Sequence, residues 1–123
     1  MKIVMIGSGY VGLVSGLCFA EFGFQTVCVD KDQHRLQNIM HGKSPFYEPG
    51  LDDLLNKHIN STKLLKLSSN LSKEVKQAKV IFITVGTPAR RLVDEADLSS
   101  VYDVVREIAD NINNYSVIVT KST

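Results

Sequence analysis

Residues 2–12 read KIVMIGSGYVG, and this stretch decides how the rest of the chain is interpreted. Lys2–Ile6 is a short apolar run of the kind that forms a buried strand. The residues after it fit the pattern G-x-G-x-x-G and open an apolar helix expected over residues 11–22, which Gly23 would end. Such glycine patterns arise often by chance, but a strand before the motif and a helix after it are the context of a dinucleotide-binding turn.

The three glycines of this motif have different physical roles. Gly7 allows a tight turn, Gly9 lets the backbone approach a pyrophosphate, and Gly12 lets the helix pack close to the strand. The backbone amides of Tyr10, Val11 and Gly12 would then face the phosphate at the positive end of the helix.

Outward from this motif, strands and helices alternate along the chain. Further strands are expected at 26–29, 64–67 (as an edge strand), 80–85 and 116–120. Further helices are expected at 31–40, 52–59, 72–79 and 99–113, and residues 43–50 form an ordered, proline-containing loop. This alternation predicts an α/β fold of the Rossmann type, a parallel sheet in the order 3-2-1-4-5 with helices on both faces. Binding residues should gather at the carboxyl ends of its strands, where Gly7–Gly12, Asp30 and Thr84–Pro88 lie.

Asp30 ends the second expected strand, roughly 20 residues after the glycine motif, where a carboxylate accepts hydrogen bonds from the ribose of an adenosine. The same carboxylate would repel a 2′-phosphate, so NAD is favoured over NADP. Lys31 and Arg35 leave the opposite choice open, because a basic residue beside the ribose accommodates a phosphate; Arg35 could instead lie along the adenine. Asp30 could also cap the next helix. A flavoprotein would carry the same motif and acid.

Composition excludes several other classes of protein. The 123 residues suit one domain and are too few for a complete two-substrate dehydrogenase. Fourteen basic and 13 acidic residues leave a net charge of +1, which argues against nucleic acid or a membrane surface as partner. The sequence shows neither a membrane span nor a signal peptide, so a cytoplasmic location is expected. Cys18 and Cys28 lie in apolar stretches and are expected to be buried free thiols, and no metal site is predicted.

Five stretches together resemble the UDP-glucose/GDP-mannose dehydrogenase family. In chain order they are GSGYVGLV at 7–14, VD at 29–30 followed by Arg35, PFYEPGL at 45–51, VGTP at 85–88 with ADL at 96–98, and TKST at 120–123. The last three are similar to the family's PIYEPGL, VGTP…DG…ADL and KSTVPVG. The stretches occur in the family's order and cover essentially the whole chain.

The resemblance implies an NAD-dependent oxidoreductase of nucleotide-sugar metabolism and polysaccharide biosynthesis. Within the family it resembles the members that oxidise UDP-glucose to UDP-glucuronate in two steps, through a thiohemiacetal on a catalytic cysteine. By the same resemblance, the adenosine diphosphate half of NAD would be held by Gly7–Gly12, Asp30 and Arg35. Lys31, next to Asp30, is also predicted to bind the cofactor.

The nicotinamide half of NAD is assigned by the resemblance alone. Val85, Gly86 and Thr87 would pass beside the cofactor toward its nicotinamide end. Thr123 corresponds to a family threonine beside the nicotinamide, which helps to position a catalytic water. Without the resemblance, a strand-end threonine bonded to backbone is the simpler interpretation.

Glu48, between two prolines, has two interpretations. Its carboxylate could order the cofactor site from a stiff backbone. Alternatively, Phe46 and Tyr47 pack the loop while Glu48 caps the helix expected from Asp52, and we favour this second interpretation.

The family's nucleophilic cysteine, its assisting lysine and asparagine and nearly all its UDP-sugar contacts lie downstream of the stretches matched here. Neither Cys18 nor Cys28 matches the catalytic motif. We therefore expect residues 1–123 to be an NAD-binding domain truncated at its carboxyl end, inactive alone and part of a homo-oligomeric enzyme that acts on UDP-glucose. A GDP-mannose or UDP-N-acetyl sugar dehydrogenase and a stand-alone nucleotide-binding module are the alternatives.

Overall fold

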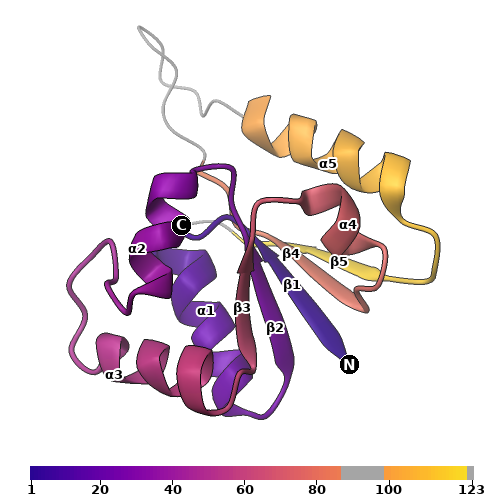
Figure 1. The fold of residues 1–123 in the computed structure, drawn as a ribbon. Helices are drawn as coiled ribbons and strands as arrows, with labels where there is room; N and C mark the ends of the chain where they lie inside the picture. Colours follow the sequence, from indigo (N-terminus) through magenta and orange to yellow (C-terminus); the bar gives the residue numbers. More distant parts are fainter. Residues whose placement is uncertain (87–98, 122–123) are drawn as a thin grey trace, which may run out of the picture.

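A computed structural model describes residues 1–86 and 99–121, in which a five-stranded parallel sheet lies between two layers of helices (Figure 1). The strands are β1 Lys2–Ile6, β2 Gln25–Val29, β3 Leu65–Ser68, β4 Val80–Ile83 and β5 Val117–Thr120. The helices are α1 Tyr10–Glu21, α2 Gln33–Met40, α3 Leu51–Asn56, α4 Leu71–Val75 and α5 Ser99–Asn111, with a π-helical turn at Lys57–Ser61 after α3. The sheet order, β3-β2-β1-β4-β5, confirms the predicted topology and the predicted edge position of β3.

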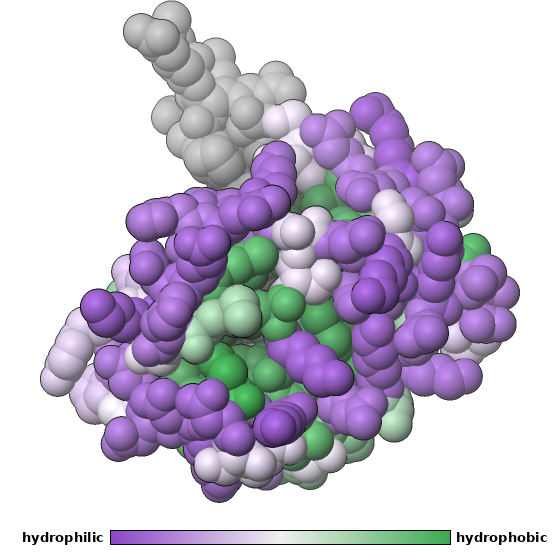
Figure 2. All heavy atoms as spheres, viewed as in Figure 1, coloured by the Kyte–Doolittle hydropathy of each residue, from purple (hydrophilic) through white to green (hydrophobic). Residues whose placement is uncertain are grey.

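The two apolar layers follow from the alternation of side chains along β1. Ile3 and Met5 point to one face of the sheet, where they pack with α1, α2 and α3. Val4 and Ile6 point to the other face, where they pack with α4 and with Ile108 of α5. Both faces of the central strand are therefore buried, as its continuous apolar sequence predicts. In Figure 2, polar residues cover much of the visible surface and apolar residues are seen toward its centre, near β3.

Local side chains set the start of two of the helices, α2 and α4. Asp32 caps α2 by accepting a hydrogen bond from the Arg35 amide at 3.1 Å, and Asn70 caps α4 by accepting one from the Lys73 amide at 3.1 Å. The expected helix 52–59 is instead α3 followed by the π-helical turn.

The expectation that both cysteines are buried is corrected for one of them. Cys28 is fully buried in β2, but Cys18 is exposed on α1. The reason is that α1 is apolar on nearly every side, so an apolar neighbourhood in the sequence does not identify its buried face.

No helix in the described ranges is long and apolar enough to cross a membrane.

Candidate functional site

A cleft of about 610 Å³ opens at the carboxyl ends of β1, β2 and β4. This is the edge at which a parallel sheet of this topology binds ligands. Most of the residues predicted for the site line it: Gly7, Gly9, Tyr10, Val11, Asp30, Lys31, Arg35, Val85 and Gly86. Thr87 and Thr123 lie outside the described residues, as do Pro88, the ADL stretch at 96–98 and Ser122.

The space around each glycine of the motif matches the geometry expected for it. Gly7 has a φ of +104°, and its amide donates to the carbonyl of Val29 at 2.7 Å, which closes the turn against β2. A Cβ on Gly12 would lie 1.9 Å from the Gly7 carbonyl oxygen, so α1 can approach the turn only with glycine there. A Cβ on Gly9 would meet nothing within 4 Å among the described residues, which leaves open space for a ligand at this point of the turn.

The first turn of α1 presents free amides beside this space. Gly9 is the N-cap and supplies no side-chain cap, and the amide of Leu13 donates to its carbonyl at 2.9 Å. The amides of Tyr10, Val11 and Gly12 therefore have no acceptor within the helix. Together with the helix dipole they form a site of positive potential that suits a phosphate.

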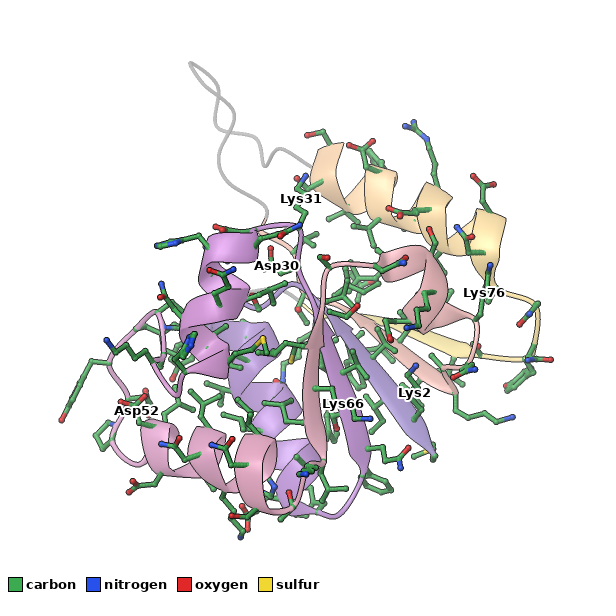
Figure 3. The ribbon with its side chains drawn as sticks, viewed as in Figure 1. Lys2, Asp30, Lys31, Asp52, Lys66 and Lys76 are labelled. Carbon is green, nitrogen blue, oxygen red and sulfur yellow. The ribbon has the colours of Figure 1, made fainter. Side chains whose placement is uncertain are left out.

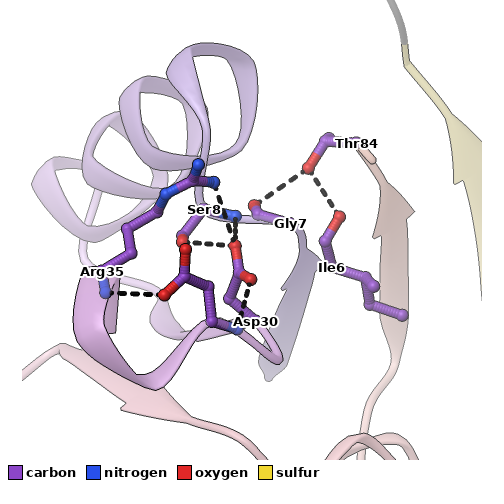
Figure 4. Close-up of polar contacts among 7 residues, drawn as sticks. Ile6, Gly7, Ser8, Asp30, Arg35 and Thr84 are labelled. Carbon is purple, nitrogen blue, oxygen red and sulfur yellow. Dashed lines mark hydrogen bonds and ion pairs between the residues drawn. The ribbon is translucent and has the colours of Figure 1, made fainter. Parts of the chain in front are cut away.

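Asp30 is held at the end of β2 by hydrogen bonds from the glycine turn (Figure 4). Its Oδ2 accepts from the Ser8 amide at 2.9 Å and from the Ser8 hydroxyl at 2.6 Å, and its Oδ1 accepts from the Asp32 amide at 2.9 Å. Burial would raise the pKa of Asp30, but the hydrogen bonds from Ser8 and Asp32 and the nearby Arg35 guanidinium outweigh it and hold the pKa below its usual value. Asp30 is therefore a carboxylate at neutral pH. Asp32, and not Asp30, caps α2.

The two basic residues of the site differ in their contacts. Arg35 places Nη1 3.5 Å from Asp30 Oδ2, so its guanidinium pairs with the carboxylate. Lys31 is exposed and lies near Asp30 at the same end of the sheet (Figure 3). The charge of Arg35 is thus neutralised by Asp30, while the charge of Lys31 lies at the rim of the cleft.

Two polar residues inside the predicted clusters have roles that the sequence did not assign. Thr84 is buried just beyond β4, and its Oγ1 donates to the Ile6 carbonyl at 2.8 Å, with the Gly7 carbonyl at 3.1 Å. Ser8 is fully buried and orients Asp30. The sequence features that could have indicated these roles are a hydroxyl at the end of an apolar strand, for Thr84, and a serine within the glycine motif, for Ser8.

Residues that the sequence did not predict form the opposite wall of the cleft. They come from α5, from the start of α4 and from the residues that follow β3 and β5: Ser69, Leu71, Ser100, Asp103, Val104, Glu107 and Lys121. These positions belong to helices and loops far along the chain. Only the folded sheet brings them to the glycine turn.

The loop before α3 corrects the favoured interpretation of Glu48. Gly50, at a φ of +81°, is the N-cap of α3 and no side chain caps this helix. The Glu48 carboxylate instead accepts a hydrogen bond from the Tyr10 hydroxyl at 3.1 Å. Phe46 packs against the core on the α1 side of the sheet, whereas Tyr47 is 90% exposed.

Free helix amides next to a carboxylate at the following strand end suit a ligand that carries a phosphate and a ribose. In a sheet of this order, that combination defines the class of Rossmann-type dinucleotide-binding domains. Residues 1–123 match the UDP-glucose/GDP-mannose dehydrogenase family, NAD binding domain, and the chain belongs to this family. The predicted family and the predicted cofactor, NAD, are thereby confirmed.

Similar proteins agree with this assignment. A UDP-glucose 6-dehydrogenase of Rhizobium meliloti (strain 1021) is 51% identical over 123 residues, which cover 100% of this chain and 28% of that protein. The structure of a GDP-mannose dehydrogenase from Pseudomonas aeruginosa superposes with a TM-score of 0.93 at 35% identity, and that of a UDP-glucose dehydrogenase from Pyrobaculum islandicum with a TM-score of 0.91 at 29% identity. The alignments cover 100% and 99% of this chain and 28% of each structure. The chain thus spans under a third of the length of these relatives.

Proposed function

We propose that residues 1–123 form one domain that binds NAD for a UDP-glucose 6-dehydrogenase. The observation that carries this proposal is the 51% identity to the Rhizobium meliloti UDP-glucose 6-dehydrogenase along the entire chain. The parent enzyme would oxidise UDP-glucose to UDP-glucuronate and would act as a homo-oligomer in the cytoplasm.

The cleft fits the adenosine diphosphate half of NAD. The open space at Gly9 and the free amides of α1 suit the diphosphate, and Asp30 is a carboxylate at the position for the ribose. Lys31 and Arg35 would flank the adenosine. We further propose that Val85, Gly86 and Thr87 lead toward the nicotinamide, and that Thr123 lies beside it.

NAD, when bound, supplies a hydride acceptor, while this chain supplies the binding surface. Neither cysteine suits the covalent step of the parent reaction: burial raises the pKa of Cys28 to about 12, and Cys18 is exposed on α1 and is not among the described residues that line the cleft. We therefore expect no NADH from UDP-glucose with this chain alone.

Isothermal titration of the chain with NAD, NADP and UDP-glucose tests this function. NAD should bind, NADP should bind more weakly because Asp30 opposes its 2′-phosphate, and UDP-glucose should give no saturable heat. A preference for NADP would contradict the role of Asp30, and absence of NAD binding would contradict the function itself. NADH formed from UDP-glucose by this chain would contradict the expected inactivity.

A second candidate is a GDP-mannose dehydrogenase, which is favoured by the TM-score of 0.93 to the Pseudomonas aeruginosa enzyme. Assays of a protein that carries this domain with UDP-glucose, GDP-mannose and a UDP-N-acetyl sugar distinguish the candidates. Turnover of GDP-mannose in place of UDP-glucose would favour the second, and NAD binding without turnover of any sugar would favour a stand-alone module.

A further inference from the structure

The loop between α2 and α3, residues 43–50, has a backbone fixed by its own hydrogen bonds. The Ser44 amide donates to Asp52 Oδ1 at 3.3 Å, and the Phe46 amide donates to Ser44 Oγ at 3.1 Å. The Leu51 amide donates to the Glu48 carbonyl at 3.1 Å. Two prolines restrict the backbone further. The loop therefore has a defined conformation and can support a side chain that packs on it.

This loop holds the side chain of Tyr10, the first residue of α1, at two points. The Tyr10 and Phe46 rings have centroids 4.9 Å apart and planes inclined at 53°. The Tyr10 hydroxyl donates to Glu48 Oε2 at 3.1 Å. The hydrogen bond to Glu48, its negative charge and partial burial all raise the pKa of Tyr10. The phenol therefore stays protonated and remains a donor at neutral pH.

Tyr10 connects this support to the cleft. It lines the cleft next to Gly9, at the end of α1 where the amides are free, whereas Glu48 is not among the described residues that line it. Glu48 therefore contacts the described lining of the cleft through Tyr10. Tyr10 is 51% exposed, so without the hydrogen bond only the contact with Phe46 would restrain its ring from rotating toward the mouth of the cleft. A ligand would then have to order the ring on binding, which lowers affinity.

We propose that Glu48 is a positioning residue for the dinucleotide, which holds the Tyr10 ring on the 43–50 loop and keeps the phosphate-binding end of α1 open. The inference rests on the proposed function, because the ligand concerned is the diphosphate of NAD. It also explains how a loop outside the cleft can contribute to binding.

Three substitutions test this role by titration with NAD. Tyr10→Phe and Glu48→Ala should each weaken NAD roughly two- to tenfold, the factor that accompanies ordering of one side chain on binding. The double variant should lose no more than either single variant, because both changes remove the same bond. Glu48→Gln, whose amide oxygen still accepts from the phenol, should bind within about twofold of the unaltered chain. The same losses should appear with ADP, which carries the diphosphate without the nicotinamide.

A spectroscopic titration separates positioning from a general structural effect. The chain has four tyrosines and no tryptophan, so phenolate absorbance reports the tyrosines directly. Tyr10→Phe identifies the Tyr10 component, and Glu48→Gln should lower its pKa toward the ordinary value because the negative charge is removed. Tyr47→Phe and Asp53→Asn, which remove a phenol and a carboxylate close by, are the matched controls and should change neither the NAD affinity nor the pKa of the Tyr10 component.

The outcomes keep the two proposals apart. If the unaltered chain binds no NAD, the proposed function and this inference both fail. If it binds NAD and both Tyr10→Phe and Glu48→Ala retain full affinity, the inference alone fails. A loss in Glu48→Gln equal to that in Glu48→Ala, additive losses in the double variant, or a loss with NAD but not with ADP would each overturn it as well.

Discussion

Replacing Gly12 with alanine should destabilise the fold by a steric conflict between backbone groups. The added Cβ would lie 1.9 Å from the Gly7 carbonyl oxygen and 2.6 Å from Thr84 Oγ1. Real Cβ contacts are essentially never shorter than 3.0 Å, so the start of α1 must move away from the turn by about 1 Å. Neither neighbour can yield easily, because one is backbone and the other is hydrogen-bonded to the Ile6 carbonyl.

The loss of stability comes from the packing contacts between α1 and the sheet that this movement weakens. Leu13 and Leu17 of α1 are buried against the sheet, and each contributes about 1.5–3 kcal/mol when fully packed. A gap of about 1 Å forfeits a quarter to a half of the dispersion contact, and the displaced Thr84 hydrogen bond adds about 1 kcal/mol. Gly12→Ala should therefore lose about 2–4 kcal/mol of unfolding free energy, which lowers Tm by roughly 6–20 °C for a chain of this size.

Gly9→Ala is the matched control for this prediction. Its Cβ would meet nothing within 4 Å, so stability should fall by less than about 1 kcal/mol. Its NAD affinity should nevertheless fall, because the methyl group occupies the space proposed for the diphosphate. Differential scanning calorimetry and titration with NAD measure the two effects separately. The reasoning is refuted if Gly12→Ala melts within about 3 °C of the unaltered chain, or if Gly9→Ala is destabilised as much as Gly12→Ala.

Three further predictions concern titratable and buried groups. Because the pKa of Asp30 is lowered in the folded state, its carboxylate stabilises the fold above its unfolded pKa and ceases to do so as pH falls through the folded value. Asp30→Asn should therefore be less stable than the unaltered chain at neutral pH and should converge with it in acid, as urea unfolding across pH would show. His58 is buried, with a carboxylate oxygen and a hydroxyl each 2.8 Å from its ring nitrogens, so His58→Leu should cost about 1–3 kcal/mol, whereas the exposed Lys57→Met should change stability by less than about 0.5 kcal/mol. A thiol reagent should label Cys18 and spare Cys28 in the native chain, because Cys28 is buried with a pKa of about 12; equal labelling rates would contradict this.

The sheet was predictable because its signals are local. Apolar runs such as Lys2–Ile6, each separated by a helix-length segment, permit few topologies, and the glycine motif marks the binding edge. The buried face of α1 was not predictable in the same way. Cys18 lies in an apolar stretch yet is exposed, because a helix that is apolar on nearly every side shows no periodic contrast.

Contacts between segments that are distant in the sequence could not be predicted from local sequence patterns either. Tyr10 and Glu48 are 38 positions apart, and a hydrogen bond between them depends on how the 43–50 loop returns toward α1. The sequence shows a glutamate between two prolines, but its place shortly before a helix favoured the interpretation that it caps this helix. Gly50 occupies that cap in the left-handed conformation, which leaves the Glu48 side chain available for Tyr10.

The hydrogen bonds of Asp30 limit how a ribose can bind to its carboxylate. The position of Asp30 in the sequence does not predict this limit. A carboxylate has about four acceptor sites, two on each oxygen. Ser8 occupies both sites of Oδ2, so Arg35 approaches an oxygen that is already saturated, which agrees with its longer distance of 3.5 Å. Asp32 occupies one site of Oδ1, and no other described residue donates to this oxygen. On the proposed function, one ribose hydroxyl can therefore bind Oδ1 without any rearrangement, and a second can reach Oδ2 only by displacing the Ser8 hydroxyl. Ser8 is thus expected to influence how the carboxylate is shared with the ligand, even though the glycine motif leaves its position unspecified.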